Sequence, residues 1–340
     1  MARNKEHRED NSKINKGLWD FIENHRYSTI FHTHRWKKVI EKTYSLNFSP
    51  FIIRSETGII GYCPFFNINN KLVLPFSYLN TPLLDGKEEV MKNKFNNKLN
   101  NNKFILNSLI ELDFKGENKT NLNNNYSTYI INLHYSTELI NKKIHKSIKR
   151  SIKKNKDEVS LRINNSKEAL NNFMLLNRLT RKKHGVPHQP DKFFYNIYSE
   201  LIENNKGDII ECEFDNIIIA SMILFKHNDK VLYAYGASNT KYNKFSANYK
   251  LINYAIFHYK KQGFNYLDLG RAQNNTGLAK FKERWGSDII SLYYYSNIKN
   301  YLNENRESRK YRLITNLWAK TPFFITNLVN DFVFKRFFLK

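Results

Sequence analysis

Cationic side chains gather in one short stretch in the second half of the chain. Arg271, Lys280, Lys282 and Arg284 all lie within it, directly after a run of residues typical of a buried strand. Ligands of open α/β sheets collect outside such strand ends, where Arg and Lys side chains hold phosphate or pyrophosphate groups. A solvated surface turn would have the same composition. The residue types therefore point to a phosphate-bearing ligand, with a surface turn as the alternative.

The strand before this stretch supplies a carboxylate. We expect the strand, which begins near Phe264, to end at Asp268 or Leu269, because Gly270 permits a sharp turn. Asp268 is placed either to accept a proton from an attacking amine or to cap the turn after the strand. The sequence leaves both roles open.

Hydrophobic periodicity predicts the elements that must position these residues. Helices are predicted over residues 28–42, 139–154, 167–184, 193–202 and 245–262. Strands are predicted over residues 51–54, 59–66, 71–76, 126–133, 208–214, 217–225, 231–235 and 264–269. The Asn- and Lys-rich residues 86–125 give no assignment. This order of elements indicates an α+β protein, with a mixed α/β sheet and helices on its faces.

The two halves of the chain share an order of strands and turns. Three strand-like runs end at Asn80-Thr81 in the first half and at Asn239-Thr240 in the second. The same offset separates Lys71 from Lys230, which indicates a duplication. We therefore expect a disordered basic tail over 1–16, an N-terminal module over 17–135, a C-terminal module over 136–297 and a C-terminal helical segment over 298–340.

Four motifs in the second half follow one another in a known order. They are a basic helix, a proline-containing loop, a strand ending Tyr-Gly-Ala-Ser, and a strand followed by a short glycine-containing loop and a run that ends in Trp-Gly. Their residues are Lys142 to Lys154, His184 to Pro190, Tyr233 to Ser238, and Asp268 to Arg271 with Gly277 and Phe281 to Gly286. Together they resemble the FemAB family, the peptidoglycan-bridge aminoacyltransferases and their GNAT-like relatives. The first half is similar to that family only in pattern.

The resemblance implies two tandem GNAT-like modules of the acyl-CoA N-acyltransferase type. It also implies amide formation, in which an amine attacks an activated carbonyl, usually an aminoacyl-tRNA ester. Lys282 and Asp268 are then the catalytic candidates, with the Lys282 charge near the carbonyl or an acceptor phosphate. The candidates for binding substrate are Arg271, Lys280, Tyr235, Ser238, Trp285 and His188, although a Trp more often anchors a core.

The acyl donor stays open between two chemistries. The resemblance favours aminoacyl-tRNA as donor and an amine of a peptidoglycan-like or lipid-linked, phosphorylated envelope precursor as acceptor. The alternative is acyl-CoA, with an amino sugar or polysaccharide unit as acceptor. Acetyl-CoA enzymes of this superfamily carry an Arg/Gln-x-x-Gly-x-Gly/Ala loop that holds the CoA pyrophosphate, and none precedes the helix predicted over 245–262. This absence disfavours a plain acetyl-CoA enzyme.

Other cofactor chemistry has little support in the sequence. There is no Walker loop and no Gly-x-Gly-x-x-Gly run, so nucleotide hydrolysis and dinucleotide redox chemistry are not expected. The two cysteines lie far apart and the histidines are scattered, so no metal site is predicted. We expect no cofactor apart from the co-substrate.

The net charge of +24 has two interpretations. It fits a polyanionic partner such as tRNA, a nucleotide-linked precursor or an anionic membrane surface. It also fits a genome rich in A and T, because Lys, Asn, Ile, Tyr and Phe are all plentiful. A non-catalytic nucleic-acid-binding protein is a further alternative, but the predicted basic helix lacks the stacking aromatics that such binding needs.

The C-terminal segment is aromatic and basic. Six phenylalanines surround Lys335, Arg336 and Lys340 after Thr321-Pro322, a good helix start. The segment is too short to span a bilayer, and it fits either a membrane interface or packing against the first module. The first residues show no secretory signal, so we expect a cytoplasmic protein, with peripheral contact at the inner membrane surface as an option.

Overall fold

The computed structural model describes residues 17–56, 58–85, 93, 95, 97, 99, 102–112, 121–298 and 309–338. The predicted tail over 1–16 and much of the unassigned stretch after Gly86 lie outside these residues. The contacts divide the chain into two compact units, Met1–Asn124 with Leu292–Leu302, and Asn125–Ser291 with Asn303–Lys340. Each unit is described by itself.

The first unit is built mainly from short antiparallel strands. Its described residues start with a helical stretch over 17–24, followed by η1 (Ile30–His32) and α2 (His34–Tyr44), and α2 buries Trp36, Val39 and Ile40. One group of strands has the order β1-β4-β5-β7, and a separate sheet has the order β2-β3-β6. The strands are β1 (Asn47–Phe48), β2 (Phe51–Ser55), β3 (Gly58–Cys63), β4 (Phe66–Ile68), β5 (Lys71–Val73), β6 (Leu83–Leu84) and β7 (Lys103–Ser108).

Two proline positions explain where the predicted strands of the first unit are shorter than expected. The strand predicted over 59–66 is two strands, β3 and β4, which stop and restart around Pro64. The strand predicted over 71–76 ends at Val73, before Pro75. Proline has no N–H to give to a sheet ladder, so it interrupts pairing.

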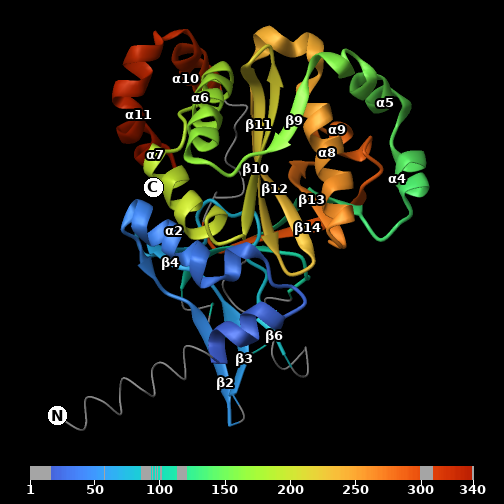
Figure 1. The fold of residues 1–340 in the computed structure, drawn as a ribbon. Helices are drawn as coiled ribbons and strands as arrows, with labels where there is room; N and C mark the ends of the chain where they lie inside the picture. Colours follow the sequence, from blue (N-terminus) through green and yellow to red (C-terminus); the bar gives the residue numbers. More distant parts are fainter. Residues whose placement is uncertain are drawn as a thin grey trace, which may run out of the picture. The chain divides into compact units, whose positions relative to one another are not determined.

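The second unit contains a mixed sheet with the strand order β8-β13-β12-β11-β10-β9 (Figure 1). Neighbouring strands are antiparallel except β12 and β13, which are parallel. The strands are β8 (Asn121–Asn132), β9 (Ser160–Ile163), β10 (Gly207–Phe214), β11 (Ile217–His227), β12 (Lys230–Ser238) and β13 (Tyr266–Gln273). A further strand, β14 (Asp288–Ser296), enters the first unit, and its residues 293–296 pair there with β7. The mixed α/β fold predicted from the sequence is confirmed.

Helices of the second unit lie on both sides of its sheet. Figure 1 shows α6 (Lys167–Lys183) and α7 (Asp191–Ile197) on one side, and α8 (Ala247–Lys261) and α9 (Gly277–Glu283) on the other. The remaining helices are α4 (Thr137–Lys143), α5 (Lys146–Lys153), η2 (Lys156–Glu158), the π-helix η3 (Tyr198–Ile202), η4 (Thr240–Phe245), α10 (Arg309–Lys320) and α11 (Phe323–Phe338).

One hydrophobic core of the second unit lies between this sheet and helices α4, α5, α8 and α9. The isoleucines at four-residue spacing in the predicted basic helix contribute to it, since Ile140, Ile144 and Ile148 are all buried. The prediction of one continuous helix over 139–154 is wrong, because α4 ends at Lys143 and α5 begins at Lys146. The chain breaks there because the backbone N–H of His145 donates to the carbonyl oxygen of Arg284 at 2.9 Å.

Candidate functional site

The parallel strands β12 and β13 part from one another soon after they meet. They pair over Lys230–Tyr266, Val231–Leu267 and Leu232–Asp268, although β12 continues to Ser238 and β13 to Gln273. Each strand also carries a bulge just beyond the paired part. Ala234 is the extra residue of β12 against β11, and β13 has one extra residue against β8 between Asp268 and Arg271. A bulge twists a strand and changes the direction of its backbone groups, so the bulges of β12 and β13 account for the separation of the two strands.

Gly270 and Asp268 form the bulge of β13. Gly270 has a φ of 74°, in the left-handed region that glycine adopts without strain. One carboxylate oxygen of Asp268 accepts a hydrogen bond from the Gly270 backbone N–H at 2.7 Å and another from the Thr128 hydroxyl at 2.6 Å. The expectation that β13 ends at Asp268 or Leu269 is wrong, because the bulge absorbs the turn of the chain and the strand continues. Asp268 therefore braces the bulge, as its capping alternative implied.

Lys282 reaches the same bulge from α9. Its ammonium nitrogen donates to the carbonyl oxygens of Gly270 at 2.8 Å and Arg271 at 2.9 Å, and it lies 5.8 Å from the centroid of the Tyr129 ring. The side chain is buried, with 7% of the residue exposed. An ammonium has three N–H groups, so these two bonds leave one, which has no oxygen acceptor among the described residues.

The surroundings of Lys282 weaken its hold on a proton. Burial lowers the pKa of the Lys282 ammonium, Asp268 opposes this shift and Arg271 adds to it, and together they bring the pKa to about 8. Arg271 itself lies with its guanidinium 5.6 Å from the centroid of the Tyr126 ring. Burial also raises the pKa of the Tyr129 hydroxyl, and the charge of Glu283 adds to this effect. The bulge thus brings together a buried cation, a carboxylate and an arginine.

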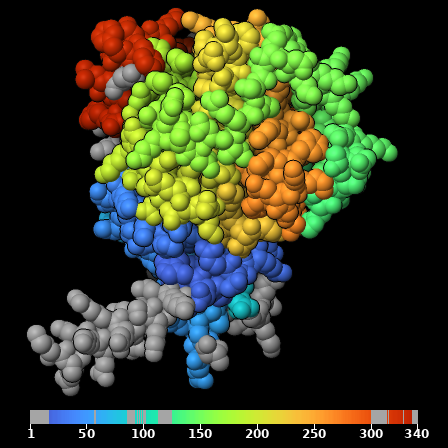
Figure 2. All heavy atoms as spheres, in the orientation of Figure 1, coloured from blue at the N-terminus to red at the C-terminus, as the bar shows by residue number. Residues whose placement is uncertain are grey.

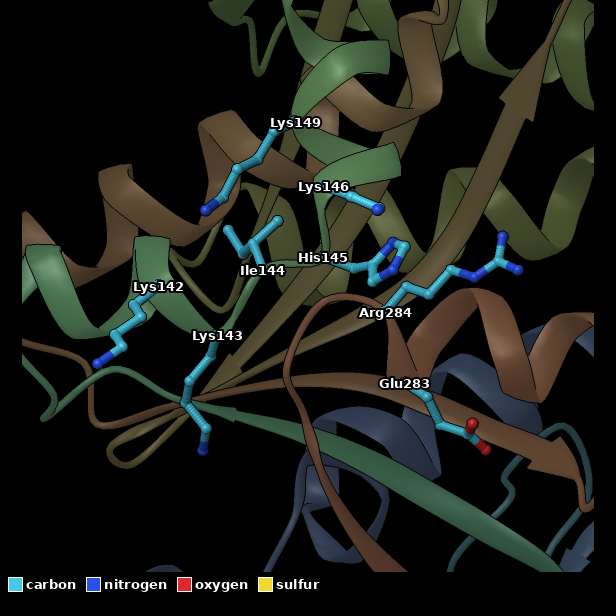
Figure 3. A pocket seen from close by; sticks show the side chains of 8 residues that line it. All are labelled: Lys142, Lys143, Ile144, His145, Lys146, Lys149, Glu283 and Arg284. Carbon is cyan, nitrogen blue, oxygen red and sulfur yellow. The ribbon is translucent and has the colours of Figure 1, made fainter.

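A basic hollow of about 570 Å³ lies beside the end of α9 (Figure 3). Its lining comes from α4, α5, the link between them and the end of α9: Lys142, Lys143, Ile144, His145, Lys146, Lys149, Glu283 and Arg284. Lys143 lies 3.4 Å from a carboxylate oxygen of Asp288. Within the described part of the chain, Lys142, Lys146, Lys149 and Arg284 have no acidic partner. This surplus of cations is suited to an anion with several charges.

Gly286 holds α4 against the end of α9 at the edge of the basic hollow. A Cβ atom on Gly286 would lie 2.5 Å from the Cβ of Lys143 and 2.9 Å from its carbonyl oxygen. The residue also has a φ of 73°. The glycine of the Trp-Gly motif is therefore required for close packing. Trp285, beside it, is 1% exposed and sits in the core, which favours an anchoring role over a substrate platform.

The other predicted site residues do not contact the bulge of β13 in any interaction seen among the described residues. Lys280 is on α9 with Lys282 but is exposed. Tyr235 packs edge-on against Phe193 and Phe194, and burial raises the pKa of its hydroxyl well above the ordinary value. Ser238 exchanges hydrogen bonds with Thr180 through its backbone.

His188 contacts α11 rather than the bulge. Its backbone N–H donates to the side-chain oxygen of Asn330 at 3.0 Å, and its Nδ1 lies 2.9 Å from the carbonyl oxygen of Gln189. The structure thus gathers Lys282, Asp268 and Arg271 at one place. Nothing in the contacts of Tyr235, Ser238 and His188 connects them to it, and their predicted roles in substrate binding stay predictions.

Two features of the site were not anticipated from the sequence. The first is the carbonyl pair that receives Lys282, which depends on the bulge and not on any side chain. The second is the joining of α4 and α5 to the end of α9 through His145 and Arg284. The density of Lys in 142–154 and the Arg284-Trp285-Gly286 run were the available signals, and nothing in either indicates that they meet.

The segment before α8 does not present a glycine loop. It is the helix η4, whose backbone N–H groups are partly used internally: Lys241 donates to the side chain of Asn239, Tyr242 to the Asn239 carbonyl and Ser246 to the Asn243 carbonyl. A cradle for pyrophosphate needs several free N–H groups pointing one way. The structure of this segment agrees with the missing glycine motif.

Comparisons with known proteins agree with this architecture. Residues 142–283 match a family model described as an acetyltransferase (GNAT) domain. A search of curated proteins gives no match. Among solved structures, the chain is similar to a crystal structure of FemX, with a TM-score of 0.66 and 13% identity over 86% of this chain and 98% of that one.

Two further similar structures come from lysylphosphatidylglycerol synthetases. One is the C-terminal domain of a putative enzyme from Agrobacterium fabrum, with a TM-score of 0.56 and 13% identity over 85% of this chain and 93% of that one. The other is L-PGS from Bacillus licheniformis, with a TM-score of 0.53 and 14% identity over 90% and 97%. Residues 142–283 therefore match a GNAT domain model, within a fold similar to that of FemX, as the motifs led us to expect.

Proposed function

We propose that this protein transfers an aminoacyl group from aminoacyl-tRNA to an amine of a cell-envelope precursor, forming an amide bond. The observation that carries the proposal is the position of α9. The helix sends Lys282 to the bulge of β13, and the chain at its end supplies Glu283 and Arg284 to the basic hollow. One short helix thus borders both a buried cation and a surface for a polyanion.

The buried cation suits the chemistry of acyl transfer. A neutral amine attacks the ester carbonyl, a C–N bond forms, the C–O bond to the ribose breaks, and the proton lost by the amine ends on the ribose oxygen. Negative charge develops on the carbonyl oxygen during this step. The remaining N–H of Lys282, in a site shielded from water, is the donor we assign to that oxygen, because preorganised donors stabilise such charge most strongly when water is excluded.

The basic hollow favours a nucleic acid as the donor. Lys142, Lys146, Lys149 and Arg284 line an open surface, which suits a phosphate backbone better than a single small ligand. The segment η4 lacks the glycine motif and uses part of its backbone N–H groups internally, so it gives no comparable support for CoA. The name of the similar lysylphosphatidylglycerol synthetases describes a lysyl group on a phospholipid, which fits an aminoacyl donor and a lipid-linked acceptor.

A second candidate donor is acyl-CoA, with an amino sugar or polysaccharide unit as acceptor. The matching family model favours it, because its description is that of an acetyltransferase domain. A non-catalytic nucleic-acid-binding role has no feature that favours it over these two, because the basic hollow is lined without aromatic rings of Phe, Tyr or Trp.

Filter binding with charged tRNA and with radiolabelled acetyl-CoA separates the donors. The variant Lys146→Glu/Lys149→Glu should bind charged tRNA about 10- to 100-fold more weakly, and its log-log salt slope should fall by about 2, since each lost phosphate contact removes about 1. The control Lys192→Glu/Lys241→Glu makes the same change in charge at exposed lysines outside the hollow. Equal weakening in both variants, or retention of acetyl-CoA alone, would count against the tRNA donor.

A further inference from the structure

The last helix, α11, carries its polar and apolar residues the wrong way round for contact with water. Its buried residues recur every four positions and are Thr326, Asn330 and Phe334, with 4%, 1% and 1% exposed. Its most exposed residues also recur every four positions and are Phe324, Leu328 and Phe332, with 73%, 85% and 73% exposed. A helix on a water-exposed surface normally shows the opposite pattern.

Hydrogen bonds fix this rotation of the helix. The side-chain N–H of Asn330 donates to the carbonyl oxygen of His188 at 3.0 Å, and the same amide accepts the His188 N–H at 3.0 Å. The hydroxyl of Thr326 donates to the carbonyl of Phe323 at 2.9 Å, within the helix. Turning the aromatic face inward would break the two bonds between Asn330 and His188 and leave buried polar groups unpaired. The outward direction of Phe324, Leu328 and Phe332 is therefore set by the fold.

The preceding helix also exposes large apolar side chains. On α10, Leu313 and Leu317 lie one turn apart and are 67% and 71% exposed. Figure 2 shows α10 and α11, in red, at the surface of the molecule. We call the set of Leu313, Leu317, Phe324, Leu328 and Phe332 the apolar face. Exposed large side chains in such a group mark a surface that another apolar phase covers.

Charge decides what covers the apolar face. Lys182 donates to the carbonyl oxygen of Thr321 at 2.5 Å, at the junction of α10 and α11, and lies 5.5 Å from the Phe323 ring centroid. Lys183 and Lys320 are exposed at the ends of α6 and α10, and α6 contacts α10. The exposed acid on α11 is Asp331, which accepts from the Asn330 amide at 3.1 Å. A second copy of this chain would bring equal cations together, and the whole chain carries +24.

We infer that α10 and α11 dock on an anionic lipid bilayer, with the apolar face in the outer hydrocarbon region and Lys182, Lys183 and Lys320 at the headgroup phosphates. Phe and Leu side chains on an interfacial helix enter the acyl boundary, and long Lys side chains reach phosphates from there. In the described ranges no helix is long and apolar enough to cross a membrane, so the helices lie along the surface. This docking goes beyond the proposed reaction and holds for either acyl donor.

Vesicle sedimentation with the full-length protein tests the docking. Vesicles of equal parts phosphatidylglycerol and phosphatidylcholine should bind the protein, and the variant Leu328→Ser should bind about tenfold more weakly, because a large side chain no longer enters the hydrocarbon. The control Ile217→Ser removes an exposed apolar side chain, 47% exposed, from the β10–β11 hairpin and should bind as the wild type does. Pure phosphatidylcholine vesicles should bind less, since the lysines then lack their partners.

Trp318 on α10 reports which surface binds. It is half-buried, and its neighbour Leu317 belongs to the apolar face. Its fluorescence should shift to the blue and be quenched by brominated lipid, and Trp318→Phe should remove most of both signals. Vesicle binding without quenching, equal binding of Leu328→Ser and wild type, or a lipid-free dimer that Leu328→Ser dissociates would each overturn the docking. Acyl transfer to a water-soluble acceptor is measured in parallel, and it should be unchanged in Leu328→Ser, which separates failure of docking from failure of the reaction.

Discussion

Each compact unit contains a pair of parallel strands whose pairing stops after a few residues. The two pairs differ in what the chain does beyond the last paired residue. In the first unit, β5 pairs with β7 at Lys71–Lys103 and Leu72–Phe104, and β5 is antiparallel to β4. In the second unit, β12 pairs with β13 from Lys230 onward and is antiparallel to β11. Lys71 and Lys230, which share the offset noted in the sequence, are the first residues of β5 and β12.

In the first unit the chain returns to close the parting. The Asn80 N–H donates to the Asn107 carbonyl at 2.8 Å, and the Asn107 N–H donates to the Asn80 side chain at 2.7 Å. The Thr81 hydroxyl oxygen accepts the Leu109 N–H at 2.9 Å. Asn80 and Thr81 are almost fully buried. Beyond the point where β5 and β7 separate, backbone groups of residues 107–109 are therefore hydrogen-bonded to Asn80 and Thr81.

In the second unit, Asn239, at the position that matches Asn80, bonds to a different strand. The N–H of Asn239 donates to the carbonyl of Ile219 on β11 at 2.9 Å, so the chain stays beside β11 and does not return to β13. The carbonyls of Gly270 and Arg271 on β13 receive Lys282 instead. The two parallel strand pairs therefore end differently, one in a polar backbone closure and one in a buried charge. This difference supports our proposal that the acyl-transfer chemistry lies in the second unit.

The largest effect expected from this comparison is on turnover. Replacing Lys282 with Ala should lower kcat about 10²- to 10³-fold, the loss typical of removing one donor to a developing oxyanion. Single-turnover transfer from charged tRNA gives the rate, and circular dichroism checks that the fold is kept. Lys192→Ala, at an exposed lysine, serves as the matched control. Turnover of Lys282→Ala equal to that of the control would remove the assignment.

A second expected effect is on the pH dependence of stability. The folded pKa of Lys282, about 8, is below its ordinary value of 10.5, so the cost of burying its charge is fully present below pH 8 and is relieved as the pH rises towards 10.5. Against Lys282→Met, the wild type should gain about 3 kcal/mol of unfolding free energy across this window. Urea titrations of both proteins at several pH values measure the difference. A difference that stays constant from pH 7 to 10.5 would contradict a buried, charged lysine.

A third expected effect is on the stability that the hydrogen bonds between Asn80 and Asn107 give to the first unit. Asn80→Ala leaves the buried Asn107 N–H without its acceptor, which should destabilise the protein by about 1–3 kcal/mol. Transfer activity at low temperature should stay at the wild-type level. Asn239→Ala removes the corresponding side chain, which accepts the Lys241 N–H, and should cost about 1 kcal/mol, as for other helix caps. A fall in kcat for Asn80→Ala with unchanged stability would mean that the first unit takes part in the chemistry.

The smallest expected effect distinguishes the two roles left open for Asp268. Asp268→Asn keeps an oxygen acceptor for the Gly270 N–H and the Thr128 hydroxyl, so a bracing residue should lose less than about tenfold in kcat, well below the loss typical of a proton-transfer group. The pH profile of kcat should keep its shape. A loss of about 10² or more, with the acidic limb of the profile gone, would show that Asp268 accepts the amine proton.

The sequence predicted the order of elements in the second unit well, because long alternating and helical patterns dominate there. It failed where a distant backbone decides the local path. The isoleucines of 139–154 have the spacing of one helix, and they are buried as one face, yet the bond between His145 and Arg284 breaks the helix in two. Local periodicity carries no information about a partner so far along the chain.

The candidate site shows the same limit. Asp268 and Lys282 stood out by type and position, and they do meet at one bulge. The pairing of Lys282 with two carbonyl oxygens was not predictable, because main-chain oxygens are present at every residue and only the left-handed Gly270 turns this pair towards α9. The predicted end of the strand at Asp268 or Leu269 was wrong for the same reason, since β13 continues to Gln273.

The ammonium of Lys282 is held by main-chain oxygens, and this has a consequence for tracing distant relatives. No change of side chain on β13 can delete those acceptors, so long as the backbone keeps its path. Such a device tolerates extensive replacement of its neighbours, and the fold is shared with FemX at 13% identity. A search for distant relatives should therefore look for a bulged strand whose main-chain carbonyls accept from a buried lysine, and give less weight to the residue types around it.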